Sequence, residues 1–231
     1  MHRERIELNV RDGTKMAAYT SRPDEEPSRP GVMVFQEAYG VNAHIRDVTD
    51  RFAREGYVAI APDLFHRTAP GFEGPYGDFE TVRPHVSALK NETMEGDIRA
   101  SYDWLRSHCN GSVVSVGFCM GGRVSFLANS IVSLRASASF YGGGIAAGLL
   151  DRTPRLQAPM LFFWGGLDKH ILPDDIRKVT DAMRASNRKF INVEISDADH
   201  GFFCDMRPSY NAIASMLSWG LVTDFFTQHL K

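Results

Sequence analysis

Short apolar runs recur along the chain, separated by stretches whose apolar residues are spaced three and four apart. The short runs predict strands at 5–10, 16–21, 32–37, 57–62, 112–118, 136–141, 159–165 and 190–196. The first two runs are joined through Asp12-Gly13 with no helical pattern between them, which predicts a hairpin.

Helical spacing follows most of the later runs. The apolar positions that mark these helices are Ile45, Val48 and Phe52; Met94, Ile98, Tyr102 and Leu105; Ile176, Val179 and Met183; and Ile213, Met216, Leu217, Leu221 and Phe225. A further helical pattern occupies 123–128. Strands that alternate with helices favour right-handed connections, so we expect an α/β fold: a mostly parallel sheet of seven to eight strands with helices on both faces.

One long segment, 66–87, is rich in glycine and proline and has no clear period, so it predicts a loop. No interval between consecutive strands is long enough to hold a cap domain. The whole chain, 1–231, is therefore predicted to be a single domain whose site is covered by loops.

Composition narrows the class of protein. The chain of 231 residues has a net charge of -2 and no dense Lys/Arg cluster, which argues against a nucleic-acid or anionic-membrane partner. No apolar run approaches the roughly 18 residues of a membrane span, and no signal peptide is visible. The cysteines, Cys109, Cys119 and Cys204, are too few and scattered for a disulfide framework or a metal cluster. We expect a soluble cytoplasmic protein, a monomer or small homo-oligomer, that needs no metal or cofactor.

The segment Gly117-Phe118-Cys119-Met120-Gly121-Gly122 joins a predicted strand to a predicted helix. Strand, sharp turn and helix form the setting of a nucleophile elbow, and the pattern G-x-C-x-G places a thiol at its tip. A dinucleotide-binding loop would need glycine where Cys119 stands. The pattern therefore predicts Cys119 as a nucleophile, whereas Cys109 and Cys204 are expected to be small buried side chains.

Two further residues follow later strands. Asp168 comes after the run at 159–165, and His200 comes after the run at 190–196. Taken alone, each could be an ordinary turn residue. The order nucleophile, acid, histidine is that of the α/β-hydrolase fold, in which strand ends bring the three to one edge of the sheet. We expect His200 to accept the thiol proton and Asp168 to orient the ring, with His170 at the border of the site.

An oxyanion hole needs two backbone N–H donors. Met120, directly after the nucleophile, predicts one, and Ala38, after the third strand, predicts the other. Glu37 stands beside Ala38 at the end of an apolar strand, where an unpaired carboxylate would be costly. Glu37 either pairs with an arginine or contacts the Cys119 thiol.

These segments resemble the dienelactone hydrolase (carboxymethylenebutenolidase) family of α/β-hydrolases over nearly the whole chain. The resemblance is carried by Gln36-Glu37-Ala38-Tyr39-Gly40-Val41-Asn42, Pro62-Asp63-Leu64-Phe65, 117–122 and Asp199-His200-Gly201-Phe202. It implies a Cys119–His200–Asp168 triad. It also implies that Glu37 holds the resting thiol by a hydrogen bond until substrate displaces the carboxylate.

The family's lactonases hold a substrate carboxylate with two arginines, one in the long loop and one four residues past the histidine. Arg83 lies in the long loop, but Cys204 occupies the second position and the next arginine is Arg207. Arg83 and Arg207 are thus the candidates, unless they pair with surface acids. Tyr39 and Phe202 are also expected to contact the substrate.

The sequence therefore predicts a hydrolase that cleaves a small ester or lactone, neutral or anionic, through an acyl-thioenzyme on Cys119. Two alternatives use the same fold. One is a non-catalytic ligand-binding protein. The other is a redox-sensing thiol with Cys204 as its resolving cysteine.

Overall fold

The computed structural model describes residues 1–24 and 28–231, which form an eight-stranded sheet with the order β1-β2-β4-β3-β5-β6-β7-β8. The strands are β1 (His2–Asn9), β2 (Lys15–Arg22), β3 (Gly31–Phe35), β4 (Val58–Pro62), β5 (Val113–Phe118), β6 (Ser137–Phe140), β7 (Met160–Gly165) and β8 (Phe190–Ile195). Each predicted strand is present. The pairs β1–β2 and β2–β4 are antiparallel, whereas β3–β4, β6–β7 and β7–β8 are parallel, so the α/β-hydrolase fold is confirmed.

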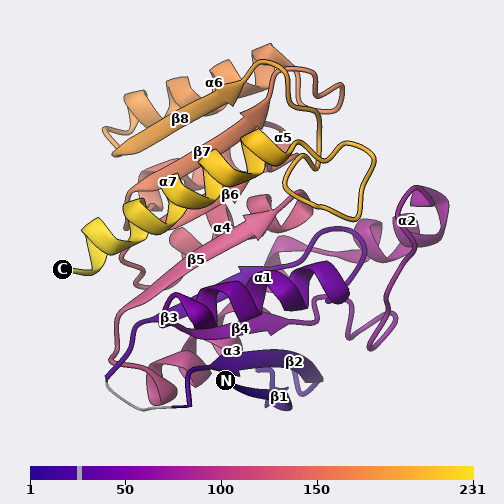
Figure 1. Cartoon of the computed structure of the whole chain (residues 1–231), viewed down its shortest axis with the longest axis vertical. Helices are drawn as coiled ribbons and strands as arrows, with labels where there is room; N and C mark the ends of the chain where they lie inside the picture. The colour runs from indigo at the N-terminus through magenta and orange to yellow at the C-terminus, as the bar shows by residue number, and fades with distance from the viewer. Residues whose placement is uncertain (25–27) are drawn as a thin grey trace. The chain divides into compact units, whose positions relative to one another are not determined.

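The chain divides into two compact units, Met1–Ser115 and Val116–Lys231, with the boundary inside β5. The first unit contains α1 (Ala43–Arg54), α2 (Phe79–Ala88) and α3 (Asn91–His108). Both α1 and α3 pack against β3 and β4, whose residues are all buried, and Figure 1 shows these two helices on opposite faces of the two strands. The helix α1 begins where the Asn42 side chain accepts a hydrogen bond from the Ile45 N–H.

The second unit contains α4 (Met120–Asn129), α5 (Ile145–Gly148), a 3₁₀ helix (Leu150–Arg155), α6 (Pro173–Ala185) and α7 (Ala212–Leu230). Within this unit α7 crosses one face of the strands, and α4 and α6 lie on the other (Figure 1). Strands β6 and β7 are buried along their whole length, while every residue of β8 is exposed or half-buried because this strand forms an edge of the sheet.

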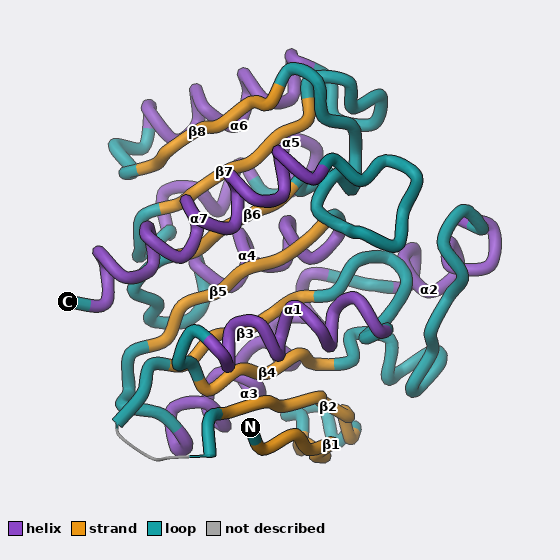
Figure 2. Tube along the Cα trace, in the orientation of Figure 1, coloured by secondary structure: helices purple, strands orange, loops and turns teal. Residues whose placement is uncertain are grey.

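The segment 66–87, predicted as a loop, also contains most of α2. Figure 2 shows a long irregular stretch followed by this short helix. It begins where the Asp78 carboxylate accepts a hydrogen bond from the Thr81 N–H, and its one buried residue is Val82. Pro84 inside the helix and the single buried position explain why apolar spacing gives no signal there.

The predicted last helix is present, but most of the apolar positions that mark it are not on its buried face. Ile213, Met216 and Leu217 are 67%, 67% and 58% exposed. The buried residues of α7 are Ala214, Ser215, Ser218, Val222, Phe225 and Phe226. The helix carries apolar residues on several sides, so spacing alone does not define its inner face.

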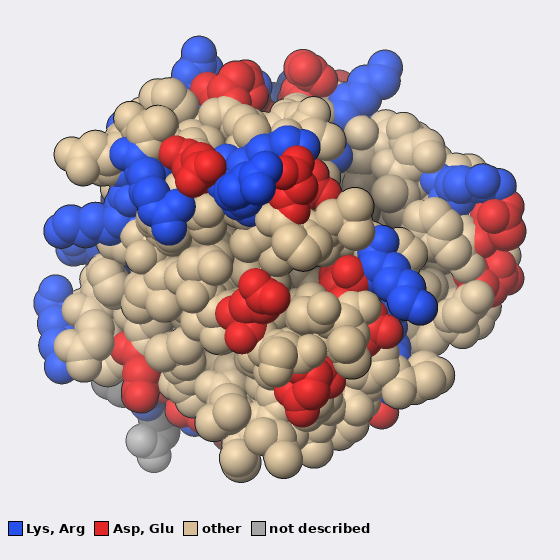
Figure 3. Space-filling view, turned by 90° about the horizontal axis from the view of Figure 1, so that it is seen from above, with Lys and Arg blue, Asp and Glu red and all other residues tan. Residues whose placement is uncertain are grey.

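The charged side chains are mixed in sign. On the face drawn in Figure 3, Lys and Arg groups stand beside Asp and Glu groups. On α6, for example, Lys178 lies 2.8 Å from Asp174, an (i, i+4) pair. Within residues 1–24 and 28–231, no helix has both the length and the apolar character needed to cross a membrane.

Candidate active site

The tip of the turn between β5 and α4 is Cys119, whose backbone has φ 54° and ψ -120°. A non-glycine residue at positive φ is strained, and strain of this kind is typical of functional turns. A Cβ on Gly117 would lie 1.8 Å from the Gly121 carbonyl oxygen, so the chain passes too closely here for any side chain. The Cys119 N–H donates to the Phe140 carbonyl at 3.0 Å, which fixes the turn against β6.

The structure brings together Cys119, His200 and Asp168, which all belong to the second unit. The sulfur of Cys119 lies 3.1 Å from Nε2 of His200. On the other side of the ring, Nδ1 of His200 lies 2.7 Å from Oδ2 of Asp168. The arrangement is that of a nucleophile, a base and an orienting carboxylate.

The Asp168 carboxylate is buried and held by more than His200. Its Oδ1 accepts hydrogen bonds from the N–H groups of His170, at 2.7 Å, and Ile171, at 3.2 Å. Burial by itself would raise the pKa of Asp168, but the hydrogen bond and positive charge of His200 and the two N–H donors leave that pKa below its ordinary value. Asp168 therefore stays ionised and orients the ring.

The His200 ring is strongly biased toward its charged form. Burial lowers its pKa, but negative charge on the Cys119 sulfur and the hydrogen bond and charge of Asp168 outweigh burial and raise the pKa of His200 to about 10. The Cys119 sulfur lies 3.1 Å from Nε2 of this ring, within reach of its proton.

Two rings that border His200 complete this part of the site. His170 packs edge-on against it, with ring centroids 5.4 Å apart and planes at 80°. The centroid of the Tyr141 ring lies 5.1 Å from that of His200. Tyr141 has a positive φ of 37°, which is unusual for a residue other than glycine. The sequence analysis did not identify Tyr141; its position directly after a buried strand and before three glycines was the available signal. Phe202 is fully buried against Tyr141, so its contact with a substrate stays a prediction.

In the first unit, the carboxylate of Glu37 is buried and accepts a hydrogen bond from the Tyr76 hydroxyl at 3.1 Å. The Asn42 side chain donates in turn to the Tyr76 oxygen at 2.9 Å. The sequence analysis predicted a partner for this carboxylate but not Tyr76, which lies in the segment without periodicity. A tyrosine hydroxyl thus helps to satisfy the buried charge.

The loop that carries Ala38 and Tyr39 is braced by the segment around Tyr76. Both residues are buried, and the rings of Tyr39 and Tyr76 lie 4.6 Å apart. Gly40 has φ 82°, and a Cβ there would lie 1.9 Å from the Phe72 carbonyl oxygen. The backbone of this loop is therefore well defined. The assignments of the Ala38 and Met120 N–H groups as oxyanion donors remain predictions.

The two candidate arginines lie in different settings. Arg83 is exposed on α2, where it pairs with Glu80, one turn away. The guanidinium of Arg207 packs against the backbone of Gly201, next to His200: a Cβ on Gly201 would lie 2.2 Å from Nη1 of Arg207. Arg207 thus reaches the residue after His200 although it comes later in the chain than the family position.

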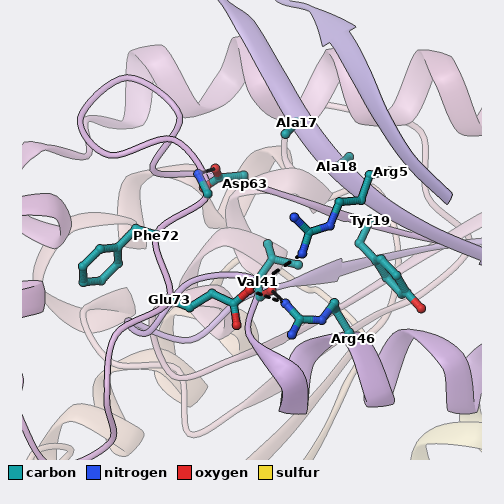
Figure 4. Close-up of a pocket in the computed structure, with 10 residues that line it drawn as sticks. Arg5, Ala17, Ala18, Tyr19, Val41, Arg46, Asp63, Phe72 and Glu73 are labelled. Atoms are coloured by element: carbon teal, nitrogen blue, oxygen red, sulfur yellow. Dashed lines mark hydrogen bonds and ion pairs between the residues drawn. The ribbon is translucent and has the colours of Figure 1, made fainter.

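A pocket in the first unit joins two other arginines to one carboxylate (Figure 4). Nη1 of Arg46 lies 2.6 Å from the Val41 carbonyl oxygen and 2.5 Å from Oε1 of Glu73, and Nη2 of Arg5 lies 3.8 Å from the same Oε1. The cluster fastens the loop around Glu73 to α1 and β1. The cluster thus supports the loop that carries Tyr76.

Comparison with known proteins identifies the family of the chain. Residues 16–230 match the model of the dienelactone hydrolase family. The chain is 36% identical over 229 residues to a Synechocystis sp. protein provisionally named carboxymethylenebutenolidase, covering 94% of this chain and 93% of that one. It is 29% identical over 220 residues to the carboxymethylenebutenolidase of Pseudomonas putida, covering 93% and 92% of the two chains. A Klebsiella pneumoniae crystal structure provisionally named dienelactone hydrolase superposes with a TM-score of 0.88 at 30% identity, covering 99% of this chain and 100% of that one.

Proposed function

The chain belongs to the dienelactone hydrolase family, and we propose that it cleaves its substrate by attack of Cys119, through an acyl-thioenzyme. It is a carboxylic-ester hydrolase or lactonase with a small-molecule substrate. The observation that carries the proposal is the connected chain of Cys119, His200 and Asp168, with separations of 3.1 and 2.7 Å.

In the first half-reaction the Cys119 thiolate attacks the carbonyl carbon, and the carbonyl oxygen becomes an oxyanion. The Met120 N–H, at the first position of α4, is one proposed donor to that oxyanion. The Ala38 N–H is the second donor, by family resemblance. The carbon–oxygen bond then breaks, and His200 gives its Nε2 proton to the leaving oxygen, which leaves a thioester on Cys119.

In the second half-reaction His200, now neutral, takes a proton from water as that water attacks the thioester. The acid product leaves, and Cys119 returns to the thiolate beside a protonated His200. Asp168 stays ionised throughout because His200 and two N–H groups hold its charge. By family resemblance, Glu37 controls when Cys119 and His200 form this ion pair.

The redox-sensor alternative has less support. Its predicted resolving cysteine, Cys204, is fully buried. A resolving thiol must reach a sulfenic acid on Cys119, which favours an accessible position. A hydrolytic role for Cys119 needs no second cysteine.

The test uses p-nitrophenyl acetate and mass spectrometry of the intact protein. Wild-type protein mixed rapidly with the ester should carry one acetyl group, and Cys119→Ala should carry none and lose at least about 10³-fold in kcat. Cys109→Ala is the matched control, because Cys109 is a half-buried cysteine in the first unit, and it should behave as wild type. Turnover by Cys119→Ala near the wild-type rate would exclude the mechanism.

A further inference from the structure

A cavity of about 450 Å³, partly open to solvent, lies in the second unit between α5 and α6. The residues that shape it include Gly142, Ala146, Ala147, Trp164, Ile171 and Val179. Nothing in the steps proposed above uses it.

The cavity borders the catalytic histidine. His170 contributes to its wall, and the same His170 ring packs edge-on against His200 with centroids 5.4 Å apart. On another side, Gly142 lines the cavity directly after Tyr141, whose ring lies 5.1 Å from that of His200. Two walls of the cavity are therefore continuous with residues that touch the triad.

The lining combines apolar side chains with polar groups, among them His170 and one carboxylate. Trp164, Ile171 and Val179 supply apolar surface, and small residues opposite them leave the space open. The lining, which lies entirely in the described part of the chain, contains no lysine or arginine. Its one carboxylate, Asp175, is 3.7 Å from Lys178. An uncharged apolar group fits this lining, and an anionic group is disfavoured.

We propose that this cavity is the subsite for the leaving alcohol of the ester, and that it accepts an uncharged aliphatic or aromatic group. The proposal rests on the proposed function, in which His200 gives its proton to the leaving oxygen. The leaving group must then lie on the His200 side of the scissile bond. The cavity adjoins His200 through the His170 ring.

Acetate esters of different alcohols test the proposal, because the acyl group and the thioester are the same for all of them. For wild-type protein, kcat/KM should rise by about fourfold for each methylene added from methyl to butyl acetate, a total ratio of about 60. The anionic ester 4-acetoxybutanoate should gain none of this increase. Asp175→Asn should raise kcat/KM for that anionic ester alone.

Ala146→Phe fills the cavity from α5 and should bring the butyl-to-methyl ratio down toward 1. Ala147→Phe, at an exposed position of the same wall, is the second variant should Ala146→Phe fail to fold. Ala185→Phe, exposed at the end of α6 and outside the cavity, is the matched control and should keep the wild-type ratio.

The outcomes separate the two proposals. A wild-type ratio near 1, or a ratio that the filling variants leave unchanged, would overturn the leaving-group subsite while the acetyl-enzyme on Cys119 still forms. Absence of that acetyl-enzyme would instead overturn the proposed function. A ratio that collapses in the filling variants and persists in Ala185→Phe supports the subsite.

Discussion

Backbone strain in the second unit is found next to His200. The non-glycine residues with positive φ in the described part of the chain are Cys119, Tyr141 and Asn187, and the first two contact His200. Such residues cost of order 1–3 kcal/mol each, so the surroundings must hold them in place. The Phe140 and Phe163 carbonyls do so, by accepting the N–H groups of Cys119 and Tyr141.

The first prediction for a single residue concerns the charge of the His200 ring. Its pKa of about 10 means that the ring should stay protonated through neutral pH and titrate only in alkaline solution. Cys119→Ala removes the negative charge that contributes most to this elevation, so the ring should then titrate at distinctly lower pH. NMR titration of the imidazole nitrogens measures both values, with Cys109→Ala as control. A wild-type ring that titrates near pH 6.5 would contradict the ion pair.

The second prediction for a single residue concerns Arg207. We expect its guanidinium to hold a carboxylate on the acyl side of the substrate. Arg207→Ala should raise KM for a carboxylate-bearing lactone by roughly 10- to 100-fold, matching a charged hydrogen bond of about 1.5–3 kcal/mol. A neutral aryl ester should change little. Equal losses on both substrates would assign Arg207 to loop support, and Arg83→Ala gives the same test for the other candidate arginine.

At the scale of elements, the turn between β5 and α4 depends on its first glycine. Gly117→Ala would place a Cβ 1.8 Å from the Gly121 carbonyl oxygen, a backbone atom that cannot move without opening the turn. We expect a loss of at least about 3 kcal/mol in the free energy of unfolding, measured by urea titration. Gly220→Ala, in α7 with open space around it, is the control and should be neutral or stabilising. Similar unfolding midpoints for the two variants would refute the steric argument.

Elements were predictable from sequence where burial was complete. The strands β3, β4 and β7 are buried along their length, so their apolar runs mark them to within two residues or so. The helix α2 buries one residue and contains Pro84, and spacing therefore could not reveal it. On α7, apolar residues at Ile213 and Met216 face outward, so spacing found the helix but not its inner face.

For the whole molecule, the topology of the sheet made the positions of Cys119, Asp168 and His200 predictable. It did not predict which residues surround them. Cys119, Asp168 and His200 follow the ends of parallel strands, and the fold brings such positions together regardless of loop detail. Tyr76 and Tyr141 were not foreseen, because their contacts depend on a loop without periodicity and on an unusual backbone angle. The approach of Arg207 to Gly201 was not foreseen either, because it depends on the path of the loop after His200.

The boundary between the two units, inside β5, also bears on how such a gene could diversify. Nucleophile, acid and base are all encoded after Ser115, whereas Glu37, Ala38 and Arg83 are encoded before it. A recombination breakpoint at Ser115 would pass on the triad as one inherited block, together with Arg207 and the cavity between α5 and α6. The other parent would then contribute the oxyanion loop and the long loop that carries Arg83. Exchange of the amino-terminal block thus offers a route to new substrates that leaves the reacting groups untouched.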